Sequence, residues 1–161
     1  MHRKKNNPQY ICQHDDYSCS PVCLYNVGQW LGDAVSLKFL TTLCHTDVDG
    51  TEDKYFNKTL RSTWNNLHVV KKRAWNNSTI FHHFENGGAV VIAHLDTDNE
   101  WHHSFWTGYR QGINTLCQEF YIYDVLQRTV DAGATPDVYF LTDLSKDRQA
   151  IRLKQKDRWI V

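Results

Sequence analysis

Apolar positions in the first half of the chain recur at the spacing of helices. Residues 20–31 (SPVCLYNVGQWL) are predicted to form a helix with Pro21 in its first turn and Gly32 just past its end. Leucines and aromatic residues that lie three or four positions apart predict further helices over 37–44 and 51–66. The N-terminal half is therefore expected to be mainly helical.

The pattern changes in the second half, where apolar runs have the length of strands. The run Ala89–Leu95 (AVVIAHL) is apolar almost throughout, which is typical of a buried central strand. Residues 102–109 and 120–125 are predicted as two neighbouring strands, and further strands are expected over 68–75 and 150–161. Helices followed by an antiparallel sheet indicate the α+β class.

Composition and charge narrow the class of protein. The chain has 161 residues, of which 41% are hydrophobic, and its 18 Lys and Arg balance 18 Asp and Glu. We expect one globular domain over residues 1–161 that does not bind nucleic acid. No apolar run reaches the ~18–20 residues that span a bilayer, and no signal peptide is evident, so we expect a cytoplasmic protein without a membrane partner. Nothing in the sequence predicts an oligomeric state.

The five cysteines do not suggest a disulfide framework. Their number is odd and the chain is not small, so we expect reduced thiols. They are Cys12, Cys19, Cys23, Cys44 and Cys117.

Cys19 is the candidate nucleophile, because it lies directly before the first predicted helix. A thiol attacks acyl carbons as the thiolate, and a helix N-terminus favours an anion. Gln13, six residues earlier, can donate a hydrogen bond to a developing oxyanion alongside the Cys19 backbone N–H. Cys23 lies one turn further on and is expected to be a buried, unreactive thiol.

A base for this thiol has to come from the predicted sheet. The segment WHHSFWTGY offers His102 and His103, and the next predicted strand, FYIYD, ends in Asp124. If the two strands pair, Asp124 can orient a histidine and stabilise its protonated form. The predicted catalytic residues are therefore Cys19, His102 and Asp124, with His103 as the alternative base.

These motifs resemble those of the papain-like cysteine peptidases, most closely the bacteriocin-processing (double-glycine leader) peptidases and their stand-alone relatives. The likeness extends over residues 9–126 and includes QHDDYSCSPVCLYNVGQWLG, DGT, STIFHHFENGGAVVIAHL, HHSFWTGY and FYIYD, in that order. It implies a papain-like fold, in which the nucleophile helix packs on a C-terminal antiparallel sheet. It also implies cleavage of a peptide or related amide bond through an acyl-enzyme on Cys19. In this family the base usually lies six positions before a glycine, which favours His102, six before Gly108.

Three positions depart from the family pattern and leave the substrate open. Ser20 follows the nucleophile and Trp101 precedes the histidine pair where glycine is common, and Val125 follows Asp124 where proline is common. None of these changes removes a reactive group.

Several alternatives to peptide hydrolysis remain. Deamidation and transamidation use the same acyl-enzyme, and a catalytically inactive member would only bind peptides. A zinc-stabilised interaction domain is a further alternative, but no second pair of ligands follows at the spacing of zinc sites. We expect a peptide or protein substrate, no cofactor and no metal. The zinc alternative would use Cys12, His14, Cys19 and Cys23.

Overall fold

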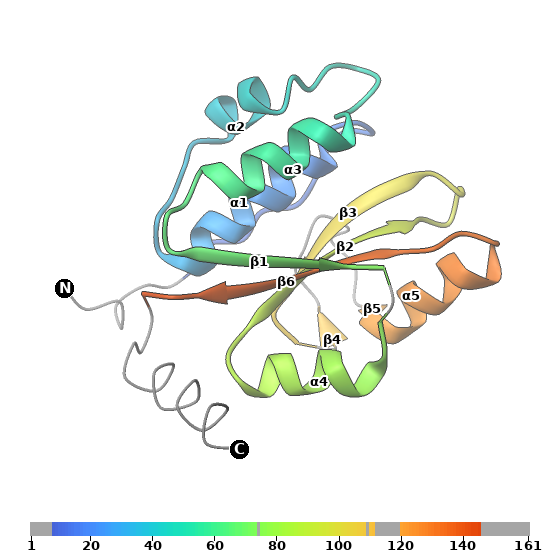
Figure 1. The fold of residues 1–161 in the computed structure, drawn as a ribbon. Helices are drawn as coiled ribbons and strands as arrows, with labels where there is room; N and C mark the ends of the chain where they lie inside the picture. Colours follow the sequence, from blue (N-terminus) through green and yellow to red (C-terminus); the bar gives the residue numbers. More distant parts are fainter. Residues whose placement is uncertain (1–7, 74, 109, 112–119, 146–161) are drawn as a thin grey trace.

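A computed structural model describes residues 8–73, 75–108, 110–111 and 120–145, which form a sheet covered by helices on both faces (Figure 1). Three N-terminal helices lie on one face and two later helices on the other. The first group is α1 (Cys19–Leu31), α2 (Leu37–Leu43) and α3 (Asp53–Ser62); the second is α4 (Asn77–Glu85) and α5 (Ile122–Asp131).

The main sheet has four strands, all antiparallel, in the order β1-β6-β2-β3. The predicted central strand is confirmed, because β2 lies between β6 and β3 and every one of its residues is buried. A separate two-residue ladder joins β4 to β5. The strands are β1 (Leu67–Lys72), β2 (Ala89–Leu95), β3 (Trp101–Trp106), β4 (Arg110–Gln111), β5 (Phe120–Tyr121) and β6 (Asp137–Asp143).

Alternate residues of the central strands divide the interior into two cores. Val91 and Phe105 pack with α1, α2 and α3, whereas Val90 and Trp106 pack with α4 and α5. Successive side chains of a strand point to opposite faces, so each strand supplies both cores. The same alternation decides which histidine of β3 faces α1.

A glycine ends α1, and a buried asparagine joins the preceding arm to the helix. Gly32 ends the helix in the left-handed conformation, with φ 72°, and its N–H bonds to the Gln29 carbonyl. Buried Asn26 accepts from the Ile11 N–H at 2.9 Å and donates to the Ile11 carbonyl at 3.1 Å. These bonds attach the N-terminal arm to α1 and so hold the segment before Cys19 beside the helix.

The segment 120–125 differs from its prediction as a single strand. Only Phe120–Tyr121 is extended, and α5 begins at Ile122. A short apolar run fits either structure, and here Ile122, Val125 and Leu126 form one buried helical face. The strand predicted over 150–161 lies outside the described residues.

The α+β class is confirmed, with helices first and the sheet mostly after them. Within the described part of the chain, no helix is both long and apolar enough to cross a membrane.

Candidate active site

A cleft of about 1270 Å³ opens at the N-terminal end of α1. Four segments surround it: the loop before α1, the segment leading into α3, the turn between β2 and β3, and the start of β6. Cys19, His102 and His103 all line it. The cleft therefore brings the candidate thiol and both candidate bases to the same cavity, and the direction of each ring decides which histidine faces the thiol.

Cys19 is the first residue of α1, which begins one position before the predicted start at residue 20, and it is half-buried. Burial raises the pKa of its thiol, whereas backbone groups of His103 and Ser20 and the Ser20 hydroxyl act to lower it. Burial has the larger effect, so the thiol is protonated at neutral pH. The Cys19 Sγ lies 4.0 Å from the Ser20 Oγ.

His103, and not His102, faces α1. The His103 Nδ1 lies 2.8 Å from the Ser20 Oγ, and the His103 ring stacks on Phe56 of α3 at 3.9 Å. His102 points to the opposite face of β3, where its ring lies 5.5 Å from the ring of His94. In this arrangement His103, and not the predicted base His102, lies on the side of Cys19, because the pleat of the strand turns the His102 side chain away.

Both histidines are neutral in this structure. Burial, together with smaller effects of neighbouring His102 and Lys71, lowers the pKa of His103 to about 3. Burial also lowers the pKa of His102 to about 4. A neutral imidazole at His103 can accept a proton, and a protonated Cys19 can give one up. The resting pair is therefore uncharged at pH 7.

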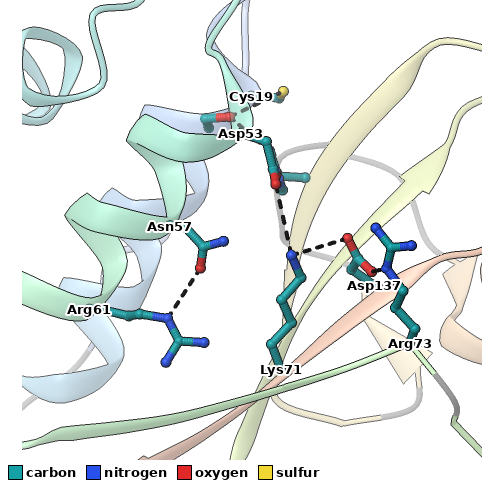
Figure 2. Close-up of polar contacts among 9 residues, drawn as sticks. Cys19, Asp53, Asn57, Arg61, Lys71, Arg73 and Asp137 are labelled. Carbon is teal, nitrogen blue, oxygen red and sulfur yellow. Dashed lines mark hydrogen bonds and ion pairs between the residues drawn. The ribbon is translucent and has the colours of Figure 1, made fainter.

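A carboxylate that the sequence did not single out faces His103. Asp53, the first residue of α3, places its Oδ1 3.8 Å from the His103 Nε2. Its other oxygen lies 3.8 Å from the Lys71 Nζ, which also lies 3.5 Å from Asp137 (Figure 2). Arg73 pairs with Asp137 at 3.2 Å. Asp53 thus links the histidine to a chain of charged groups that extends across the sheet.

Asp124 does not occupy the position predicted for it. It lies exposed in the first turn of α5, and it is absent from the residues around the cleft. The helix α5 packs on the face of the sheet opposite to α1. Asp124 consequently cannot orient His103 in this arrangement.

Gln13 lines the cleft, but its side chain bonds to its own loop. The Gln13 Nε2 donates to the Asp15 carbonyl at 2.7 Å. The Asp15 side chain accepts from the backbone N–H groups of Tyr17 and Ser18, at 2.9 and 2.7 Å. This turn leads directly into α1, and a rotation of the Gln13 side chain would free its amide for an oxyanion.

The cysteines and histidines proposed for a zinc site do not form one. Cys12 is disulfide-bonded, so the expectation of reduced thiols does not hold for it, and Cys117 lies outside the described residues. Cys23 is completely buried in the core under α1. Among the described residues, no three His, Cys, Asp or Glu side chains are grouped to hold a metal ion.

Comparisons with known proteins identify the family and the fold. The sequence matches the model of the peptidase C39 family over residues 7–110. The structure is similar to the peptidase domain of Streptococcus ComA, which is described as a bifunctional ABC transporter involved in a quorum-sensing pathway. The TM-score is 0.60 at 13% identity, over 83% of this chain and 98% of that domain. That likeness confirms the predicted papain-like fold. No curated protein matches the sequence.

Proposed function

The chain belongs to the peptidase C39 family, and from this premise we propose that it hydrolyses a peptide or related amide bond through an acyl-enzyme on Cys19. Membership makes it a papain-like cysteine peptidase, which implies a peptide or protein substrate. One observation supports the mechanism above all others. Cys19 at the start of α1 and His103 on β3 line the same cleft, with the Ser20 hydroxyl between them.

The reaction follows from the chemistry of this pair. His103 takes the proton of the Cys19 thiol as the sulfur attacks the carbonyl carbon. The oxyanion is stabilised by the Cys19 N–H and by Gln13 once its amide leaves the Asp15 carbonyl; one such donor contributes ~3–4 kcal/mol. The C–N bond then breaks, and His103 gives its proton to the leaving amine. Water attacks the thioester, which releases the acid and restores the thiol.

Asp53, and not Asp124, orients the catalytic histidine and stabilises its protonated form in this mechanism. Its negative charge, 3.8 Å from the His103 Nε2, favours the tautomer of His103 with the proton on that nitrogen. In that tautomer Nδ1, on the side of α1, can accept the thiol proton. When His103 becomes protonated, the negative charge of Asp53 stabilises it.

The test is cleavage of defined peptides followed by mass spectrometry. Peptides with two consecutive glycines are the first substrates to try, because the family resemblance favours them, and a proteome-derived mixture extends the search. We expect new peptide termini with the wild type and none with Cys19→Ala. Equal cleavage by Cys19→Ala would contradict the proposal. A mass gain of about 1 Da at glutamine without cleavage would instead indicate deamidation.

A further inference from the structure

The hydroxyl of Ser20 contacts both members of the proposed catalytic pair. Its Oγ lies 2.8 Å from the His103 Nδ1 and 4.0 Å from the Cys19 Sγ. The Ser20 side chain is 1% exposed, so bulk water does not compete for these contacts. Its place is fixed by the first turn of α1, which also carries Cys19.

The surroundings of His103 hold its Nδ1 against this hydroxyl. Stacking on Phe56 fixes the plane of the ring, with an angle of 10° between the two rings. The negative charge of Asp53, 3.8 Å from Nε2, favours a proton there. The Nδ1 lone pair therefore points at Ser20, whose hydroxyl can donate one hydrogen bond and accept two.

We propose that Ser20 carries the proton from Cys19 to His103 when the thiol attacks, an inference that rests on the proposed function. The S–H bond of Cys19 breaks and its proton passes to the Ser20 oxygen. The original Ser20 proton moves to the His103 Nδ1. Ser20 is a hydroxyl before and after the step, and the products are a thiolate and an imidazolium. The reverse transfers restore the thiol at the end of the cycle.

The electrostatics of Cys19 agree with this role. Burial raises the pKa of the Cys19 thiol, and the Ser20 hydroxyl is one of the groups that oppose burial by favouring the thiolate. A donor that stabilises the product of proton transfer also lowers the barrier to forming it. Removing the Ser20 hydroxyl should therefore slow proton transfer from Cys19 to His103, in addition to any effect on packing.

The experiment is the pH dependence of iodoacetamide alkylation at Cys19, mapped by mass spectrometry. A thiol with a neutral base beside it reacts at a rate that does not change with pH, as long as the base stays neutral and the thiol protonated. An isolated thiol reacts about tenfold faster for each pH unit, as thiolate accumulates. We expect a plateau between about pH 5 and pH 8 in the wild type. Ser20→Ala should lose the plateau, and Ser20→Thr, which keeps a hydroxyl, should retain it.

Ser104→Ala is the matched control. The Ser104 Oγ lies 2.9 Å from the His94 Nε2, and Ser104 is completely buried on the opposite face of the sheet. It thus repeats the serine–histidine contact away from the cleft. We expect Ser104→Ala to lower the unfolding temperature and to keep the Cys19 plateau.

The outcomes separate this inference from the proposed function. A plateau in Ser20→Ala equal to the wild type would overturn the relay, because the thiol would then give its proton to His103 directly. Loss of the plateau in Ser104→Ala as well would also overturn it, since the effect would be one of packing. If His103→Ala loses the plateau and Ser20→Ala keeps it, only the role of Ser20 fails. If the wild type shows no plateau, the proposed function fails too.

Discussion

At the scale of single residues, the site depends on which side chains the backbone turns toward Cys19. His102 and His103 are adjacent in sequence, yet the pleat of β3 sends them to opposite faces. His103 meets Ser20, Phe56 and Asp53, whereas His102 meets His94. Two adjacent histidines of one strand therefore differ in role: His103 lies on the face toward α1 and is the candidate base, whereas His102 lies on the opposite face.

The two candidate carboxylates can be compared directly. Asp53→Asn should lower kcat/KM about two- to fivefold, because the Asp53 side chain is 59% exposed and an exposed charge pair contributes at most about 1 kcal/mol. Asp124→Asn should leave kcat/KM unchanged, since Asp124 lies on α5 away from the cleft. Steady-state kinetics on a cleaved peptide measures both. A loss in Asp124→Asn with full activity in Asp53→Asn would restore the original prediction.

At the scale of elements, the arm before α1 determines the position of Gln13, the residue proposed to stabilise the oxyanion. Asn26 fixes Ile11 by two hydrogen bonds, and the Gln9 N–H bonds to the Gln29 side chain at 3.0 Å. The arm therefore follows α1 closely up to the turn that contains Gln13. Packing of the arm, and not only the turn itself, determines where Gln13 can reach.

Removing this attachment should weaken the fold. Asn26→Ala leaves the N–H and the carbonyl of Ile11 without their partner in a partly buried place, which should lower the free energy of unfolding by ~1–3 kcal/mol. Asn57→Ala is the control: the hydrogen bond that Asn57 accepts from Arg61 is exposed, and its loss should change stability by less than ~0.5 kcal/mol. Urea unfolding compares the two. Equal losses would show that Asn26 has no special role.

Local signals made some elements predictable and others not. Pro21 and Gly32 mark the ends of α1 in the sequence itself, so the place of Cys19 at its start could be foreseen. The sequence could not show which residues of β3 point toward α1. Phe105 and Trp106 are both apolar and buried, so the strand lacks the alternation of polar and apolar residues that would distinguish its two faces. Asp53 lies near His103 because α3 packs against the sheet, and no sequence motif predicts a contact that arises from such packing.

At the scale of the whole molecule, buried histidines couple stability to pH. Burial lowers the pKa of His94 to about 3, with smaller lowering effects from nearby His102, His103 and Arg128 and an opposing effect from the Leu95 carbonyl. An unfolded histidine has a pKa of about 6.5, so the unfolded state binds protons that the folded state does not as pH falls below that value. Stability is therefore full above pH 6.5 and is lost progressively toward pH 3.

The expected loss can be measured by urea unfolding at pH 7 and pH 5. His94 alone should account for a loss on the order of 2 kcal/mol at pH 5, at about 1.4 kcal/mol per pH unit below 6.5. His94→Gln should lose less stability than the wild type between the two pH values. Identical pH dependence in both proteins would contradict the neutral state of His94.

The charge of the cleft is also a property of the whole molecule. The chain has no net charge, yet the residues around the cleft include eight carboxylates and only one arginine, Arg73. Such a cavity attracts cations, and the attraction weakens as salt screens it. The carboxylates are those of Asp15, Asp16, Asp49, Asp53, Asp96, Asp98, Glu100 and Asp137.

A pair of matched peptides tests whether the negative charge of the cleft selects the substrate. A peptide with lysines flanking the cleaved bond should have a higher kcat/KM than its glutamate counterpart, and the difference should shrink as salt concentration rises. The double variant Asp98→Asn, Glu100→Gln should reduce the preference without changing the site around Cys19. Equal rates for both peptides at low salt would show that the carboxylates do not select the substrate.

The pairing of Cys19 with His103 is the central claim, and the rate of iodoacetamide alkylation at Cys19 between pH 5 and pH 8 tests it most directly. The wild type and His102→Ala should both react at a rate that is constant over this range, because a neutral His103 stands ready to take the thiol proton. His103→Ala should instead react about tenfold faster for each pH unit, as an unassisted thiol does. A constant rate in His103→Ala, or its loss in His102→Ala, would contradict the assignment of His103 as the base.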